Sequence, residues 1–178
     1  MSATHNMILA GFGGQGVLFA GKMIAYAGMI DERQVSWLPS YGPEMRGGTA
    51  NCSVIVSDDP IGSPIVLAPD LLIALNYPSY EKFESKLIAG GKLIADSSLI
   101  PVQSERTDID ASYIPATQMA NENGLKGLAN MIALGKAVKE SGFTSFETIQ
   151  KACAKCVPAK KAQMLELNLK ALEMGYNY

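Results

Sequence analysis

Histidine is almost absent from this chain of 178 residues, because His5 is the only one. A Ser-His-Asp or Cys-His catalytic site would have to use His5, and a polar N-terminal segment is a poor platform for such a site. A metal site built from several histidines is excluded outright. If the chain takes part in catalysis, we expect it to act with a cofactor or a partner subunit.

Cysteine is also scarce, with only Cys52, Cys153 and Cys156. Three thiols do not form the disulfide framework of a small secreted protein, and they are too few for an iron–sulfur cluster held by four thiolates. Cys153 and Cys156 form a C-x-x-C pattern, but it falls late in an expected helix. A thioredoxin-like site would instead open its helix. We expect buried free thiols, and a redox role for the pair stays the weaker alternative.

The sequence has neither a basic cluster nor a long apolar run. Its 15 basic and 17 acidic side chains give a formal net charge of −2, which is not typical of nucleic-acid binding. The longest apolar region, residues 65–75, is broken by Pro69 and Asp70 and is too short to cross a bilayer. No basic segment leads into an apolar run at the N-terminus, which argues against a signal peptide. We therefore expect a cytoplasmic protein with no nucleic-acid or membrane partner.

The length of 178 residues fits a single domain over residues 1–178. Hydrophobic residues make up 48% of the chain, enough for a sizeable core. Expected strands cover residues 7–10, 34–37, 50–57, 71–75, 92–96 and a short segment near 113–115. Expected helices cover residues 17–29, 78–87, 118–123, 128–141, a segment opened by a capping box at Thr144-x-x-Glu147, and 159–174. This alternation predicts an α/β fold: an open, mostly parallel, Rossmann-like sheet with helices on both faces and a helical C-terminal third.

A glycine-rich turn joins the first expected strand to the first expected helix. Its sequence, Gly11-Phe12-Gly13-Gly14-Gln15-Gly16, satisfies the G-x-G-x-x-G pattern, in which glycines allow a tight turn, close approach of a ligand and close helix–strand packing. The amides at the helix start also favour an anion. The acid that would bind the ribose of NAD is missing, because the second strand ends at Trp37-Leu38-Pro39. This disfavours a nicotinamide site. Two alternatives remain: an anion bound jointly with another chain, and a turn packed against a neighbouring subunit.

A second glycine-rich loop lies between the second and third expected strands. It runs Ser40-Tyr41-Gly42-Pro43-Glu44-Met45-Arg46-Gly47-Gly48-Thr49-Ala50-Asn51 and is costly to order without a partner. Arg46 is the residue of this loop best suited to bind an anionic ligand, because a guanidinium matches the geometry of phosphates and carboxylates. An equal alternative is that Arg46 forms a salt bridge with Glu44 or with an acid on a partner chain. Tyr41 and Met45 line a pocket or, more commonly for such side chains, pack locally.

Five motifs of this chain, in their order along the sequence, resemble those of the gamma subunit of 2-oxoacid:ferredoxin oxidoreductases. The resemblance covers nearly the whole chain. It rests on the two glycine-rich loops, on Pro69-Asp70 and Gly90-Gly91 before apolar strands, and on Asn130-Met131-x-x-Leu134-Gly135. Residues 44–51 most resemble the 2-oxoglutarate and branched-chain 2-oxoacid members of this pyruvate/ketoisovalerate oxidoreductase gamma family. The small subunit of indolepyruvate oxidoreductase is a close relative that shares the glycine turn.

The resemblance implies a non-autonomous subunit of an oxidoreductase. The complex converts a 2-oxoacid, CoA and oxidised ferredoxin to an acyl-CoA, CO2 and reduced ferredoxin. Thiamine diphosphate and Mg would lie on the alpha and beta subunits, and iron–sulfur clusters on the beta or ferredoxin-like delta subunit. The gamma subunit would contribute to CoA binding and close the active site, without catalytic residues or metal ligands of its own. A stand-alone nucleotide-binding module and a purely structural assembly subunit are the alternatives.

The candidate CoA-binding residues come from the two glycine-rich loops and from the start of a later helix. Asn130, in that helix, either caps it or contacts a ligand, and capping is the better expectation. The set is Gly11, Gly13, Gly14, Gln15, Gly16, Tyr41, Gly42, Glu44, Met45, Arg46, Gly47, Gly48 and Asn130.

Overall fold

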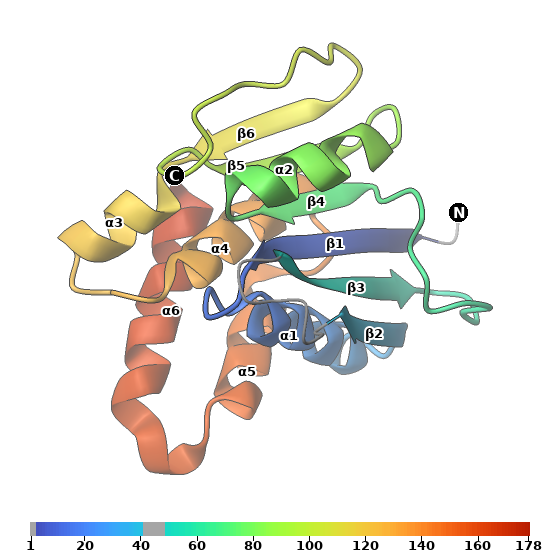
Figure 1. Cartoon of the computed structure of the whole chain (residues 1–178). Coiled ribbons are helices and arrows are strands. Elements are labelled where there is room, and N and C mark those ends of the chain that lie inside the picture. Colours follow the sequence, from blue (N-terminus) through green and yellow to red (C-terminus); the bar gives the residue numbers. More distant parts are fainter. Residues whose placement is uncertain (1–2, 41–48) are drawn as a thin grey trace.

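A computed structural model describes residues 3–40 and 49–178, which form one six-stranded sheet with flanking helices (Figure 1). The strands are β1 (Thr4–Phe12), β2 (Gln34–Ser40), β3 (Thr49–Ser57), β4 (Leu71–Ala74), β5 (Lys92–Asp96) and β6 (Asp110–Ile114). The helices are α1 (Val17–Ile30), α2 (Tyr77–Phe83), α3 (Ala116–Glu122), α4 (Ala129–Ser141), α5 (Phe146–Cys156) and α6 (Ala162–Asn177), with single 3-10 turns η2 (Glu84–Lys86) and η3 (Ala159–Lys161).

The strand order of the sheet is β2-β3-β1-β4-β5-β6. β1, β4, β5 and β6 pair in parallel, whereas β3 is antiparallel to both of its neighbours, β1 and β2. Five of these six strands therefore run in one direction. The predicted open, mostly parallel α/β sheet with a helical C-terminal third is confirmed.

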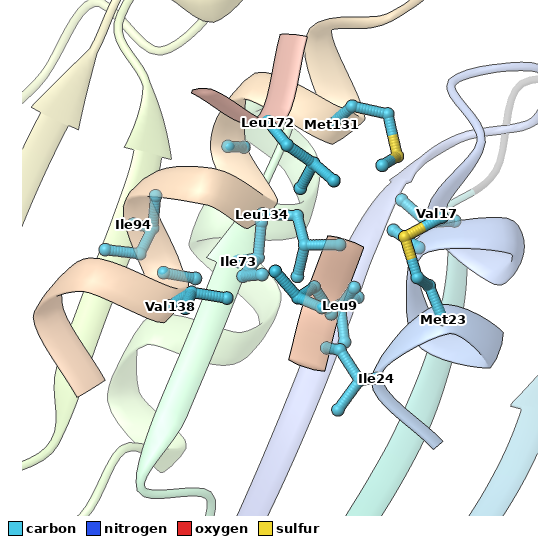
Figure 2. Close-up of a cluster of buried hydrophobic side chains, with 14 of the residues drawn as sticks. Leu9, Val17, Met23, Ile24, Ile73, Ile94, Met131, Leu134, Val138 and Leu172 are labelled. Carbon is cyan, nitrogen blue, oxygen red and sulfur yellow. The ribbon is translucent and has the colours of Figure 1, made fainter. Parts of the chain in front are cut away.

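Two apolar cores cover the two faces of the sheet. Met7 and Leu9 of β1 pack with side chains from α1, α4, α5 and α6. Ile8 and Ala10 point to the opposite face and pack with α2 and neighbouring segments. Figure 2 shows part of the first core, with Leu9 among side chains of the helices that cover it. Burial on both faces explains why β1 is a continuous apolar run rather than an alternating one.

The last helix crosses α4 at very short range. A Cβ on Gly135 of α4 would overlap the carbonyl oxygen of Leu172 in α6, and a Cβ on Gly175 would overlap the carbonyl oxygen of Ile132. The two backbones are therefore in direct contact. This crossing gives a physical role to Gly135, which ends the last of the five family motifs.

The start of α5 differs from the prediction. Ser145 is the N-cap, and its Oγ accepts a hydrogen bond from the Thr148 amide at 3.0 Å. The Thr144 hydroxyl instead donates to Asp31 Oδ2 at 2.6 Å. The predicted capping box at Thr144-x-x-Glu147 is therefore wrong, because the N-cap lies one residue later, at Ser145. Thr144 ties the start of α5 to the end of α1, a long-range contact that local spacing does not reveal.

Asp70, just before β4, is a partly buried carboxylate. Burial raises the pKa of Asp70 to about 6, although the Asn6 amide donates to Oδ1 at 3.1 Å and favours the charged form. His5 Nδ1 lies 3.7 Å from Asp70 Oδ2. Burial, and secondarily Arg33, lowers the pKa of His5. Both groups therefore titrate in the folded protein away from their usual ranges.

We expect Asp70→Asn to stabilise the fold at pH 7.5 and to leave it unchanged near pH 4. The folded state holds the Asp70 proton more tightly than the unfolded chain, whose Asp pKa is about 3.9. The favourable contribution of the protonated group is therefore complete below about pH 4 and is lost as the pH rises through about 6. The expected difference at pH 7.5 is about 1–3 kcal/mol. Urea denaturation of the wild type and Asp70→Asn from pH 4.5 to 7.5 measures the difference in their free energies of unfolding. A difference that stays constant across that range would contradict the prediction.

Candidate functional site

The glycine-rich turn lies at the carboxyl end of β1, on the edge where open α/β sheets bind ligands. β1 leads into α1 on one face of the sheet, and the neighbouring β4 leads into α2 on the other. The chain therefore changes faces between two adjacent strands. This topological switch point is the place where such sheets carry their binding sites.

The side chain of Gln15 fastens the turn to the end of β4. Its Oε1 accepts a hydrogen bond from the Phe12 amide at 2.6 Å, and its Nε2 donates to the carbonyl oxygen of Leu75 at 3.0 Å. A Cβ on Gly11 would lie 2.6 Å from Gln15 Oε1, so glycine at this position leaves room for the amide. Gln15 thus shapes the turn, with both ends of its amide engaged inside the chain.

Asn130 fastens the other end of the turn. Its Nδ2 donates to the carbonyl oxygen of Gly16 at 3.0 Å. Gly16 has a φ of 75°, and a Cβ there would lie 2.5 Å from Asn130 Nδ2. The N-cap of α4 is Leu128 and makes no side-chain cap bond, so the expectation that Asn130 caps its helix is wrong. It instead spans 114 positions of sequence to hold the glycine turn.

Between the hydrogen bonds made by Gln15 and Asn130, no other part of the described chain covers the backbone of the turn at Gly13 and Gly14. A Cβ on Gly13 or Gly14 would meet nothing within 4 Å. Gly14 has a φ of 93° that favours glycine, whereas no such constraint applies at Gly13. Exposed glycine backbone beside the start of α1 suits an anionic group, because the helix dipole and the free amides point there.

Two cavities flank the turn. The first, of about 300 Å³, lies between the start of α4, α1 and the segment joining α5 to α6, and we call it the α4–α6 cavity; Gly16 and Asn130 line it. The second, of about 180 Å³, is lined by Gly14, Gln15 and residues of α3, and we call it the α3 cavity. Gly127, just before α4, lines both. The glycine turn therefore separates two hollows at the same sheet edge.

Asp96 positions α3 beside the turn. This carboxylate at the end of β5 is 0% exposed. It accepts hydrogen bonds from the Ser98 amide at 3.0 Å, the Thr117 amide at 3.2 Å and the Thr117 hydroxyl at 2.5 Å. Asp96 is absent from the predicted site, although an acid at the carboxyl end of a buried strand is a usable signal.

The remaining predicted site residues belong to the second loop. Tyr41, Gly42, Glu44, Met45, Arg46, Gly47 and Gly48 lie outside the described residues and stay predictions. The ends of the loop are described: Ser40 pairs with Asn51, and Thr49 pairs with Phe12. Both ends therefore start from the sheet edge that carries the glycine turn.

The cysteines have the environment of structural thiols. Cys52 and Cys153 are buried and Cys156 is half-buried, all unpaired. Burial raises the pKa of Cys52 to about 12 and that of Cys153 to about 11, so both thiols are protonated at neutral pH and unreactive. Cys153 and Cys156 lie at the end of α5 rather than at its start. Free thiols, as expected, are therefore found at all three positions.

Two further properties concern metals and membranes. Over residues 3–40 and 49–178, no three side chains of His, Cys, Asp or Glu gather closely enough to hold a metal ion. No helix in the described part of the chain has the length and apolar character needed to span a bilayer.

Comparison with known proteins identifies relatives over almost the full chain. Residues 6–178 match the family model of pyruvate ferredoxin/flavodoxin oxidoreductase. The chain is 38% identical over 168 residues to the ketoisovalerate oxidoreductase subunit VorA of Methanothermobacter thermautotrophicus, covering 94% of this chain and 35% of VorA. It therefore spans about a third of the length of that relative. It is also 34% identical over 171 residues to the 2-oxoglutarate synthase subunit KorC of Methanocaldococcus jannaschii, covering 94% of this chain and 90% of KorC.

Solved structures give the same result. The keto/oxoacid ferredoxin oxidoreductase gamma subunit of Geobacter sulfurreducens is similar with a TM-score of 0.87 and 32% identity, over 98% of this chain and 95% of that one. The 2-oxoglutarate:ferredoxin oxidoreductase of Magnetococcus marinus, solved with 2-oxoglutarate, coenzyme A and succinyl-CoA bound, shares the fold with a TM-score of 0.87 and 24% identity, over 98% of this chain and 30% of that one. The resemblance in the sequence is thus confirmed, and the chain belongs to the pyruvate ferredoxin/flavodoxin oxidoreductase family, with the gamma subunits of 2-oxoacid:ferredoxin oxidoreductases.

Proposed function

We propose that this chain is the gamma subunit of a thiamine-diphosphate-dependent oxidoreductase that converts 2-oxoglutarate, CoA and oxidised ferredoxin to succinyl-CoA, CO2 and reduced ferredoxin. Within that complex it binds and orients CoA and closes the active site. The similarity to KorC over 90% of its length supports 2-oxoglutarate as the substrate. The fold shared with an enzyme solved with coenzyme A bound supports a role in CoA binding.

The observation that carries the CoA role is the open backbone of the glycine turn. Gln15 and Asn130 hold the turn from both sides, and Gly13 and Gly14 leave its centre uncovered. Such a rigid, uncovered turn at a helix start can accept a phosphate group without rearranging. The second loop, with Arg46, starts from the same edge and would add a guanidinium to the site.

In this proposal the other components belong to partner subunits. Thiamine diphosphate with Mg is held by the alpha and beta subunits, iron–sulfur clusters by the beta or ferredoxin-like delta subunit, and ferredoxin accepts the electrons. Thiamine supplies the carbanion chemistry. The present chain would bind and orient CoA and exclude water from the active site. The complex works in the cytoplasm.

Replacing Gly13 by alanine tests the proposal in the co-expressed complex. A methyl group fits at Gly13 without a clash, so stability should change by less than about 0.5 kcal/mol. The same methyl group would stand where a ligand approaches the backbone. We expect the KM for CoA to rise about tenfold, equivalent to about 1.4 kcal/mol of binding, while the KM for 2-oxoglutarate stays unchanged.

Gly62→Ala is the matched control, because its Cβ also meets nothing within 4 Å and it lies outside the turn. It should leave all kinetic constants at wild-type values. If Gly13→Ala lowered the yield of assembled complex and left the KM for CoA unchanged, the turn would be an assembly contact and the CoA role would be lost. Faster turnover of indolepyruvate than of 2-oxoglutarate would favour the indolepyruvate oxidoreductase alternative.

A further inference from the structure

The connection between α5 and α6 concentrates positive charge. Residues 148–165 contain four lysines, Lys151, Lys155, Lys160 and Lys161, and no acid. Since the whole chain has a formal net charge of −2 and this segment carries +4, the remaining residues carry −6. All four lysines are exposed. We call residues 151–161 the α5–α6 tip. Such an asymmetry of charge indicates a surface for an oppositely charged partner.

The α5–α6 tip projects from the body of the molecule. Figure 1 shows α5 and α6 meeting in a turn beyond α1 and away from the sheet. At the other end of this hairpin, the rings of Phe146 and Tyr176 hold the two helices together, with their centroids 4.4 Å apart. Nearer the turn, Cys153 and Val157 are 0% and 7% exposed. The tip is therefore a packed projection that presents its lysines in a fixed arrangement.

Most lysines of the tip lack a partner within the chain. Lys151 pairs with Glu147, with Nζ 2.6 Å from Oε1. Within the described residues, Lys155, Lys160 and Lys161 have neither a carboxylate within ion-pair distance nor an aromatic ring beneath the ammonium group. Most other basic side chains of that part have one or the other. Three positive charges close together in sequence are thus left uncompensated.

Local electrostatics explains only one of these three charges. Lys155 lies in the last turn of α5, where the helix dipole favours a cation. Lys160 and Lys161 directly precede α6, which has no acid in its first turn. The dipole of α6 disfavours positive charge at this end. These two lysines are therefore unfavourable within the chain, and carboxylates on another molecule would compensate them.

The composition of the tip favours a protein over other anionic macromolecules. Nucleic-acid sites commonly combine arginine with aromatic side chains, and residues 148–165 contain neither. A helix that lies on a membrane needs an exposed apolar face, whereas Val157, the bulky aliphatic residue of the tip, is buried. The charge of −6 on the remaining residues also opposes the approach of a phosphate polymer or an anionic bilayer. An acidic protein surface fits the tip best.

We propose that the α5–α6 tip docks on an acidic surface of another subunit of the complex. The inference rests on the proposed function, because it takes this chain to be one subunit of a larger enzyme. Carboxylates of the other subunit pair with Lys155, Lys160 and Lys161 at the rim of the interface. Charges in such positions speed association and fix orientation more than they add affinity. The contact should therefore depend strongly on salt.

Charge reversal in the co-expressed complex tests this assignment. We expect Lys155→Glu combined with Lys160→Glu to weaken retention of this chain about tenfold at about 0.05 M salt, and to have no effect at about 1 M, where the Debye length is about 3 Å. Native mass spectrometry of a dilution series measures the bound fraction. Lys155→Gln with Lys160→Gln should cause a smaller loss. Lys82→Glu with Lys86→Glu is the matched control, because it makes the same change of charge at two exposed lysines of α2 and η2, and it should have no effect. Lys161 is kept because it lines the α4–α6 cavity.

Circular dichroism of the free chains establishes that the variants fold, and the assembled variants should keep the wild-type KM for CoA. The assignment is wrong if the tip and control reversals weaken retention equally. It is also wrong if the tip reversal leaves retention unchanged, whether or not it raises the KM for CoA or weakens binding to an RNA oligonucleotide or to anionic vesicles. If Gly13→Ala still raises the KM for CoA in that case, the proposed function stands and only the docking surface fails.

Discussion

Alanine at Gly135 or Gly175 is expected to destabilise the fold by at least about 3 kcal/mol. At each position the added methyl group would overlap a carbonyl oxygen of the other helix, that of Leu172 or that of Ile132. The obstructing atoms belong to helical backbone, so no side-chain rotation removes the clash. Only a shift of α6 away from α4 can do so, and that shift opens the core that Leu172 fills.

The two substitutions should not be additive. One displacement of α6 relieves both clashes, so the double variant should lose little more stability than either single variant. Urea denaturation followed by circular dichroism measures all three proteins. Glu173→Ala, on the exposed side of α6, is the control and should change stability by less than about 0.5 kcal/mol. Single variants with wild-type stability would show that the helices are not in backbone contact.

The second large effect is expected at Asp96. Asp96→Ala removes the acceptor of the Ser98 and Thr117 amides and of the Thr117 hydroxyl, and we expect a loss of about 2–4 kcal/mol. Because these bonds tie the start of α3 to β5, amide hydrogen exchange in α3 should accelerate more than in α4.

Two further substitutions serve as comparisons for Asp96→Ala. Asp96→Asn keeps an acceptor oxygen and should lose less stability than the alanine variant. Asp108→Ala removes a carboxylate from the surface ion pair with Arg106 and should cost no more than about 1 kcal/mol. Equal losses for Asp96→Ala and Asp108→Ala would mean that the buried carboxylate does not anchor α3.

Local pattern predicts the elements of this fold well. The apolar run before Gly11 and the helical spacing after Gly16 place β1, the turn and α1 correctly, since each depends on neighbouring residues. The direction of β3 does not follow from its own residues, because an alternating strand fits either orientation. The helix expected over residues 78–87 ends at Phe83, and Leu87 is buried after a 3-10 turn instead.

The candidate site is predictable only where its chemistry is local. The open backbone at Gly13 follows from the glycine pattern. The bond from Asn130 to Gly16, and the cavity residues Lys161 and Asn168, depend on how distant helices pack. Those helices meet through contacts such as the Gly135 crossing, which no short motif encodes.

The α4–α6 cavity joins the beginning of the chain to a segment near residue 168: Gly16 and Phe19 face Lys161, Met164 and Asn168 across it. During synthesis the glycine turn and all six strands leave the ribosome before α6 does. A nascent chain can therefore form the sheet and the turn while one wall of the hollow is still missing. Any ligand that needs this wall would stabilise only chains that have docked their last helix, so it would report on complete folding as well as occupy a site.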